Sequence, residues 1–208
     1  MNFNIIKKNL SKTYDDLADY WGWDKTLHDW GEDDIEKLAK QIGKDGKVLD
    51  LGCASGYQSK ILSDLGLDVT GLDLSRAMIS AAANRIPEAE FVVGDMTNMK
   101  FKANTFDGVY SRASILHIPK KLVPKVFKSI SKILKGNGIF YLAIKEGEFE
   151  GQVEDERHGM KVNRFFSFFK EKEIEKLVES AGFKIESIDK YKRQGGSTVW
   201  LKIFARKI

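Results

Sequence analysis

The residues best suited to chemistry lie in a glycine-rich turn that contains Asp50, Gly52, Ala54 and Gly56. The apolar run before the turn predicts a buried strand, and a helical pattern follows it. Glycine and alanine let the backbone of such a turn approach a ligand closely. The helix that follows points its free N–H groups and the positive end of its dipole at the same turn. We therefore expect a polar, partly anionic ligand there.

The spacing of this turn separates two classes of cofactor site. The dinucleotide fingerprint has glycines at its first, third and sixth positions. Counted from Gly52, the third position is Ala54 and the sixth is Tyr57. The turn is therefore wrong for a nicotinamide or flavin enzyme. A tight strand–helix turn that binds nothing is the structural alternative, and the residues downstream weigh against it.

Further polar residues follow the next apolar runs, at Asp73, Asp95 and Ser111. In an open α/β sheet, ligands bind outside the carboxyl ends of the strands, so we expect these residues to share one site with the turn. A carboxylate in the position of Asp73 can accept hydrogen bonds from both hydroxyl groups of a ribose. The structural alternative for Asp73 is an acid that stabilises a helix N-terminus.

Five predicted strands alternate with amphipathic helices and must position these residues. Parallel strands joined by helices need crossover connections, so the pattern predicts an α/β fold with a doubly wound, mostly parallel sheet and helices on both faces. Two more strands, joined by a turn with Gly195 and Gly196, predict a C-terminal antiparallel hairpin and bring the sheet to seven strands. The predicted strands cover 47–51, 68–72, 90–93, 106–110, 139–144, 183–191 and 198–206.

The motif Asp50-x-Gly52-x-Ala54-x-Gly56 resembles the first motif of class I S-adenosylmethionine-dependent methyltransferases of the small-molecule type. A parallel sheet with a terminal antiparallel hairpin is the arrangement of that Rossmann-like family. The resemblance therefore covers the chain from about residue 47 to its end. It implies a transferase that uses S-adenosylmethionine as its cofactor and releases S-adenosylhomocysteine.

The resemblance also implies which residues hold the methionine portion of the cofactor. The backbone at Gly52, Ala54 and Gly56 is expected to approach that portion, together with the backbone at Ser111. Asp50 is expected to organise the turn and the amino group.

The nucleoside portion is assigned in the same way. The resemblance places Asp73 on the ribose hydroxyl groups and Asp95 on the adenine amino group. Leu74, Met78 and Met96 are expected to sandwich the adenine ring. Taken singly, a methionine is more often a filler of the core.

The acceptor side follows from the reaction that the resemblance implies, which is methyl transfer by in-line displacement to an O or N atom of a small molecule. His117 comes soon after the fourth strand and is a candidate base, because an unperturbed imidazole titrates near about pH 6.5. A histidine that satisfies local backbone groups is the alternative. Tyr14, Tyr20 and Arg164 are the predicted acceptor contacts. We expect no metal, because no Cys/His set has ligand spacing.

Two segments outside the alternating pattern are predicted to cover the site within a single methyltransferase domain over 1–208. The first is an N-terminal helical cap over 1–43. The second is a charged and aromatic insertion over 146–169, which is expected to form a substrate lid, with a floppy excursion as the alternative. Apolar residues at near-helical spacing open the cap: Ile6, Leu10, Leu17 and Trp21. An aromatic stretch continues it, with Trp23, His28 and Trp30.

Composition limits the classes of partner. The chain has 208 residues, of which 42% are hydrophobic and 31% charged, as in an ordinary soluble domain. A net charge of +4 is too small to imply nucleic acid. Cys53 is the single cysteine, so no intramolecular disulfide can form and a cytoplasmic location is expected. We expect a small-molecule acceptor, no membrane or nucleic-acid partner, and a monomer or homodimer.

Two other functions stay open at this stage. The Lys-rich helix predicted over 120–135 allows an RNA or protein substrate, although a solvated helix face explains it equally well. A non-catalytic module that binds S-adenosylmethionine would carry the same turn. Enzymes that methylate the amino groups of nucleic-acid bases typically have an Asn/Asp-Pro-Pro-aromatic motif after the fourth strand, whereas this chain has Ser-Arg-Ala-Ser over 111–114.

Overall fold

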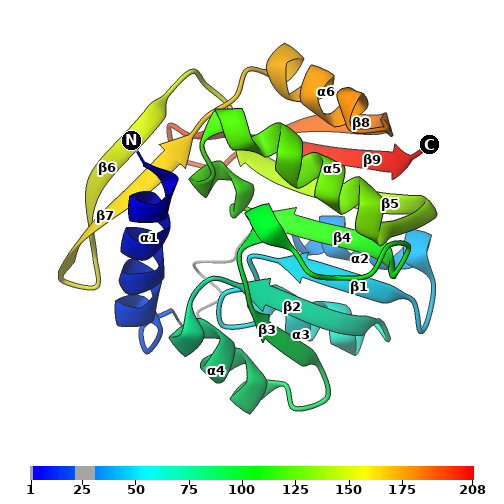
Figure 1. Cartoon of the computed structure of the whole chain (residues 1–208), viewed down its shortest axis with the longest axis horizontal. Coiled ribbons are helices and arrows are strands. Elements are labelled where there is room, and N and C mark those ends of the chain that lie inside the picture. Colours follow the sequence, from blue (N-terminus) through cyan, green and yellow to red (C-terminus); the bar gives the residue numbers. More distant parts are fainter. Residues whose placement is uncertain (1, 22–30) are drawn as a thin grey trace.

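A seven-stranded sheet with the order β3-β2-β1-β4-β5-β9-β8 forms the centre of the computed structural model (Figure 1). The structure describes residues 2–21 and 31–208. Strands β1 to β5 pair in parallel, and β9 runs antiparallel between β5 and β8. The predicted fold class is therefore confirmed. The strands are Lys47–Leu51 (β1), Asp68–Asp73 (β2), Glu90–Val93 (β3), Phe106–Arg112 (β4), Leu134–Lys145 (β5), Phe183–Lys192 (β8) and Val199–Lys207 (β9).

Helices cover both faces of this sheet. On β4, Val109 belongs to a core cluster shared with α5 and α6, whereas Tyr110 belongs to a second cluster shared with α2 and α3. Successive residues of a strand point to opposite faces, so the two clusters lie on opposite sides of the sheet. These helices and α4 span Glu32–Ile42 (α2), Tyr57–Asp64 (α3), Arg76–Arg85 (α4), Val123–Ile133 (α5) and Glu171–Ser180 (α6).

Helix α2 is fixed to the sheet by a buried polar contact. The Asp34 carboxylate accepts hydrogen bonds from Tyr141 Oη at 2.8 Å and from Lys202 Nζ at 2.9 Å. Because a buried charge is costly unless it is paired and hydrogen-bonded, this contact fixes where α2 can pack. The two helices of the segment predicted as an N-terminal cap therefore lie in different places. Helix α2 packs on the sheet, and α1 packs on β7 and α4.

Helix α1 (Phe3–Leu17) lies against β7 and α4, at the left of Figure 1. Of the residues predicted for its apolar face, Ile6 and Leu10 are buried against Phe165 and Leu17 is buried against Met78. The fourth, Trp21, is half-buried and follows the helix. Polar contacts add to this packing, because the Asp15 carboxylate accepts hydrogen bonds from the hydroxyl of Ser75 and the backbone N–H of Ala77. The predicted aromatic stretch with Trp23, His28 and Trp30 lies outside the described residues.

The insertion after β5 forms an antiparallel ribbon of β6 (Glu150–Arg157) and β7 (Met160–Ser167). His158 and Gly159, both with positive φ (51° and 75°), make its two-residue turn. Positive φ at both central residues is the geometry of the tight hairpin turn that matches strand twist. At the base of the ribbon, Glu146 pairs with Phe169. The insertion is therefore ordered, and its role as a lid stays a prediction.

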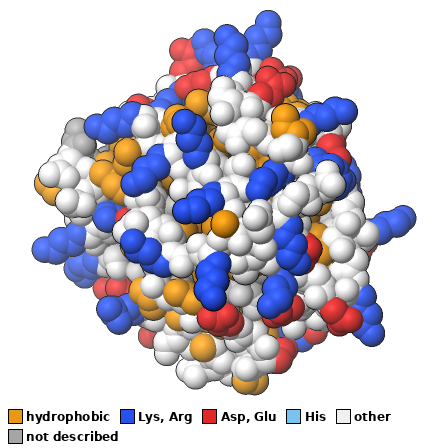
Figure 2. All heavy atoms as spheres, turned by 45° about the vertical axis from the view of Figure 1, so that its right-hand side comes forward, with side chains coloured by type: hydrophobic (Ala, Val, Ile, Leu, Met, Phe, Trp, Pro, Cys, Tyr) orange, Lys and Arg blue, Asp and Glu red, His pale blue; other side chains and the backbone are white. Residues whose placement is uncertain are grey.

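Lysine and arginine side chains are spread over the face shown in Figure 2, among acidic and apolar groups. The apolar side of helix α5 is buried in the core, while Lys125, Lys128 and Lys132 on the helix and Lys121 just before it are exposed. These lysines fit a solvated helix face. Within the ranges that the structure describes, no helix combines the length and apolar character needed to cross a membrane.

Candidate active site

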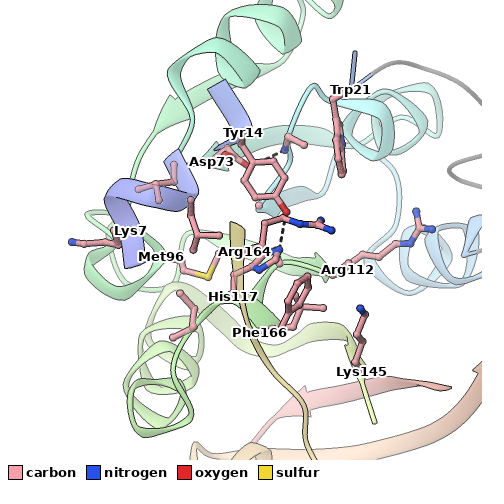
Figure 3. A pocket seen from close by; sticks show the side chains of 18 of the residues that line it. Lys7, Tyr14, Trp21, Asp73, Met96, Arg112, His117, Lys145, Arg164 and Phe166 are labelled. Atoms are coloured by element: carbon pink, nitrogen blue, oxygen red, sulfur yellow. Dashed lines mark hydrogen bonds between the residues drawn. The ribbon is translucent and has the colours of Figure 1, made fainter. Parts of the chain in front are cut away.

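A cavity of about 360 Å³ opens at the carboxyl ends of the parallel strands, beneath α1 and β7. Residues that follow β1, β2, β3 and β4 line one part of it, and side chains of α1 and β7 line the other (Figure 3). Its size is within the range of pockets that hold a small organic ligand. The predicted residues that line it are Gly52, Ala54, Asp73, Leu74, Asp95, Met96, Tyr14, His117 and Arg164.

The glycine turn has the backbone that its sequence indicates. Gly52, Ala54 and Gly56 have φ angles of 83°, 46° and 87°, and Gly56 precedes α3. A Cβ at Gly52 would lie 2.2 Å from the Cβ of Ser114, so a larger residue there would have to displace the loop after β4. Gly52 and Ala54 line the cavity, whereas Gly56 supports the turn next to Ile86 of the α4 end.

Asp50 and Ser111 lie behind the cavity wall. The Asp50 carboxylate is buried and accepts a hydrogen bond from Ser59 Oγ at 2.6 Å, which ties the end of β1 to α3. Burial raises the pKa of Asp50 to about 7. Ser111 Oγ lies 2.8 Å from Ser114 Oγ, which donates to the carbonyl oxygen of Leu51. Both predicted residues therefore shape the turn from beneath.

Asp73 lies in the cavity wall with part of its hydrogen-bonding capacity already used. Its two oxygens accept hydrogen bonds from the backbone N–H groups of Ala54 (3.0 Å) and Ser75 (2.9 Å). Burial raises the pKa of Asp73, and these N–H groups act against the rise. A carboxylate has about four acceptor positions, so two hydroxyl groups of a ligand can still be accepted.

Of the four residues predicted to contact adenine, three line the cavity and one lies behind its wall. Leu74, Asp95 and Met96 line the cavity. Met78 is completely buried in the cluster beneath α1. Lys7 of α1 donates to Asp95 Oδ2 at 2.8 Å, a contact that sequence reasoning missed because nothing local marks this helix lysine. Burial raises the pKa of Asp95, but Lys7 and Thr97 outweigh it and the pKa is lowered.

His117 and Tyr14 form a hydrogen-bonded pair between the loop after β4 and α1 (Figure 3). His117 Nδ1 lies 2.6 Å from the carbonyl oxygen of Phe165, so Nδ1 carries the proton and donates. Nε2 is then the acceptor, and the Tyr14 hydroxyl donates to it at 2.8 Å. Burial lowers the pKa of His117 to about 3. A general base would need a pKa near neutral pH, and the burial of His117 acts against this.

The buried imidazole makes the stability of the fold depend on pH. The pKa of His117 falls from 6.5 to about 3 on folding, so the unfolded state binds more protons between these values. Stability from this group is fully present above pH 6.5 and is lost as the pH falls toward 3. The contribution of Asp50 to stability depends on pH in the opposite direction. Its pKa rises from 3.8 to about 7 on folding, so this contribution is lost as the pH rises through that range.

Replacing His117 with glutamine is expected to reduce the loss in free energy of unfolding between pH 7 and pH 4. Between pH 7 and pH 4 the neutral imidazole accounts for roughly 3 kcal/mol of lost stability, and an amide cannot titrate. Urea unfolding at several pH values measures the difference. The exposed His158→Gln variant is the matched control and should keep the wild-type slope. Equal slopes in wild type and His117→Gln would mean that the folded imidazole titrates normally.

Of the remaining predicted acceptor contacts, one lies in the cavity and one at its edge. Arg164 of β7 is 7% exposed and lines the cavity. Tyr20 is 54% exposed and stacks on His158 with ring centroids 5.6 Å apart. Lys145, at the end of β5, also lines the cavity and was missed. The signal was available, because Lys145 follows an apolar strand as Asp73 does.

Comparison with known proteins agrees with this geometry. A family model described as "Methyltransferase domain" matches residues 49–142. The chain is 30% identical to a sterol 24-C-methyltransferase of Debaryomyces hansenii, over 70% of this chain and 42% of that protein. It is 33% identical to phosphoethanolamine N-methyltransferase 1 of Triticum aestivum, over 72% of this chain and 30% of that protein. The chain thus spans less than half the length of these curated relatives.

A solved structure extends the likeness to nearly the whole fold. It is 1,6-didemethyltoxoflavin-N1-methyltransferase of Burkholderia thailandensis, crystallised with 1,6-didemethyltoxoflavin and S-adenosylhomocysteine. The TM-score is 0.76 at 20% sequence identity, and the match covers 99% of this chain and 88% of that one. At this identity the likeness concerns the fold. The family match over residues 49–142, the sheet order and the strand-end residues together support a class I S-adenosylmethionine-dependent methyltransferase.

Proposed function

We propose that this chain transfers a methyl group from S-adenosylmethionine to an O or N atom of a small-molecule acceptor. The observation that carries the proposal is the cavity lined by Gly52, Asp73 and Asp95 at the ends of three neighbouring parallel strands. When bound, the cofactor supplies a methyl group on a sulfonium sulfur; the carbon–sulfur bond breaks, its electron pair stays on sulfur, and an acceptor lone pair forms the new bond.

The residues present fit this cofactor. Asp73 retains acceptor capacity for two ribose hydroxyl groups, and Leu74 and Met96 provide the apolar surface that an adenine ring needs. Asp95 can accept from an amino group at the same end of the cavity, next to Lys7. The backbone at Gly52, with a φ of 83°, would allow the methionine portion to approach the turn closely.

On the acceptor side, we assign His117 a positioning role through Tyr14. A base with a pKa of about 3 is almost entirely unprotonated at neutral pH but takes up a proton poorly. By accepting the Tyr14 O–H, His117 Nε2 leaves the phenolic oxygen as an acceptor, shared between the Arg164 side chain and an N–H or O–H of the methyl acceptor. Tyr14 can then orient the acceptor, which is the main requirement of a displacement reaction.

Three substitutions separate positioning from base catalysis. If His117 positions Tyr14, His117→Gln should keep most of the turnover rate, because an amide can both donate to Phe165 and accept from Tyr14. His117→Ala and Tyr14→Phe should each lower kcat by roughly tenfold or more, since a misplaced acceptor reacts slowly. A glutamine variant as slow as the alanine variant, together with a kcat profile that follows an imidazole, would restore the base role.

The function itself is tested with methyl-labelled S-adenosylmethionine. Calorimetry with S-adenosylmethionine and S-adenosylhomocysteine measures binding, and release of S-adenosylhomocysteine over a panel of amines, phenols and carboxylic acids measures transfer. Binding followed by product release on any acceptor supports the proposal. Binding without turnover across the panel favours a non-catalytic module, and the absence of binding would refute the cofactor assignment.

A further inference from the structure

Positive charge gathers at the end of the cavity where the acceptor is proposed to bind, and the inference that follows rests on that function. The carboxylates of Asp73 and Asp95 line the nucleoside end, where Lys7 pairs with Asp95. In Figure 3, Arg112 and Lys145 lie across Tyr14 and His117 from Lys7 and Met96. Besides Lys7, the described lysine and arginine residues that line the cavity are Arg112, Lys145, Arg157, Arg164 and Arg193.

Two of these cations share one aromatic ring. Lys145 Nζ lies 4.5 Å from the centroid of the Phe166 ring, and Arg164 Cζ lies 5.1 Å from the same centroid. Lys145 also lies over Phe168 and Trp200, at 5.2 and 5.7 Å. Among the residues that the structure describes, the Lys145 ammonium has aromatic neighbours and no carboxylate partner. Cation–π contacts orient these two groups without neutralising their charge.

The Arg164 guanidinium is buried but only partly compensated. Its Nη2 donates to Asp155 Oδ2 at 2.7 Å, and Arg157 Nε donates to the same oxygen at 2.9 Å. One carboxylate is therefore shared between two guanidinium groups. Arg164 Nε is buried and has no hydrogen-bond partner. Because a buried charged donor is costly to leave unsatisfied, Arg164 favours an anionic acceptor of its remaining hydrogen bonds.

These charges affect one another across the cavity. Burial lowers the pKa of the Lys145 ammonium, and the positive charges of Arg164 and Arg157 lower it further. Arg164 also contributes to the lowered pKa of His117. Such coupling is expected in a cavity of low dielectric constant, where an anion placed among the cations would be bound more strongly than at an exposed site.

We propose that the methyl acceptor carries an anionic group, a carboxylate or a phosphate, which Arg164 and Lys145 bind beside the Phe166 ring. The planar guanidinium of Arg164 suits two parallel hydrogen bonds to such a group, and the Lys145 ammonium adds a point charge. Bound in this way, the anion leaves the rest of the acceptor free to reach Tyr14 Oη and the carboxyl end of β4. The anion contact then selects the acceptor, and Tyr14 orients its reacting atom.

The test uses inorganic phosphate and acetate as probes at low ionic strength, by calorimetry, with and without saturating S-adenosylhomocysteine. Arg164→Gln and Lys145→Gln are each expected to weaken binding by about tenfold or more, since each removes a charge-assisted contact. Lys128→Gln on the exposed side of α5 removes the same net charge far from Phe166 and should leave the affinity unchanged. Tighter binding of phosphate or of acetate identifies which group the acceptor carries.

The outcomes separate this inference from the proposed function. If neither probe binds wild type, or if Lys128→Gln weakens binding as much as Arg164→Gln, the anion site is refuted even when S-adenosylhomocysteine still binds. If S-adenosylhomocysteine fails to bind while the probes bind and respond to both variants, the cofactor assignment fails and the anion site stands. Circular dichroism checks that Arg164→Gln folds, and Lys145, which is only half-buried, provides the second independent variant.

Discussion

Asp73→Ala is expected to weaken binding of S-adenosylmethionine by at least about a hundredfold, because two charge-assisted hydrogen bonds of roughly 1.5–3 kcal/mol each are removed. The loss also frees the backbone N–H groups of Ala54 and Ser75, which the carboxylate holds at 3.0 and 2.9 Å. The glycine turn and the start of α4 then lose their common partner. Calorimetric titration of wild type and variant with S-adenosylmethionine measures the effect.

The matched control is Asp68→Ala, at the other end of the same strand. Asp68 is exposed and pairs with Lys47 across β1 and β2. An exposed ion pair contributes little to stability, so this variant should bind the cofactor as wild type does. Equal affinities for wild type and Asp73→Ala would mean that Asp73 serves the turn and α4 rather than the ribose.

Removal of residues 2–20 is expected to abolish methyl transfer and to loosen the retention of S-adenosylhomocysteine, while the sheet stays folded. Helix α1 supplies Lys7, Leu10 and Tyr14 to the cavity wall, so its loss opens the acceptor end to water. The two large core clusters lie on the faces of the sheet, and their buried residues come from other elements, with Phe3 the α1 residue packed against one of them. Turnover assays, cofactor binding and far-UV circular dichroism test the three parts of this expectation.

Two point variants on α1 refine that experiment. Asp15→Ala removes the acceptor of the Ser75 hydroxyl and the Ala77 N–H, so it should partly reproduce the deletion. Lys12→Ala removes an exposed i,i+4 pair with Asp16 on the outer side of the helix and should leave activity unchanged. An active truncated chain with the same choice of acceptor would show that α1 does not form the acceptor site.

The central strands were predictable because they are buried on both faces, which leaves a continuous apolar run in the sequence. Strand β1, which is buried except at its first residue, has the predicted bounds Lys47–Leu51. The edge strand β3 also has its predicted bounds, Glu90–Val93, although it is exposed at both ends and half-buried between them. Strand β5 begins at Leu134, earlier than predicted. The later start was predicted because Asn137 and Gly138 have the sequence of a turn. Instead, an irregularity in the pairing with β4 absorbs these residues, and Asn137 has a φ of 62°.

The β6–β7 ribbon was not recognisable as strands. Most of β6 is polar and exposed or half-buried, so hydrophobic alternation is weak. Its turn contains His158 before Gly159, whereas asparagine or aspartate before glycine is the usual hairpin signal. Strand β7 packs against α1, which comes about 150 positions earlier in the sequence, and local periodicity does not report such contacts.

The candidate site was predictable where one side chain follows one strand, as with Asp73 and Asp95. The partners of these residues were not, because they depend on how distant elements pack. Lys7 reaches Asp95 from 88 positions away, and Tyr14 reaches His117 from 103 positions away. The burial that lowers the pKa of His117 arises from the same packing. Sequence patterns report local periodicity and carry little information about such contacts.

The dependence of the cavity on α1 has a consequence for how the chain folds. Helix α1 precedes the sheet in the chain, yet a lone helix of 15 residues is only marginally stable in water. Its partners on β7 follow all five parallel strands, and contacts so distant in sequence form slowly. The parallel strands can therefore assemble before α1 has a place to dock. The acceptor end of the cavity is then among the last parts of the domain to form, and the proposed methyl transfer requires that this step is complete.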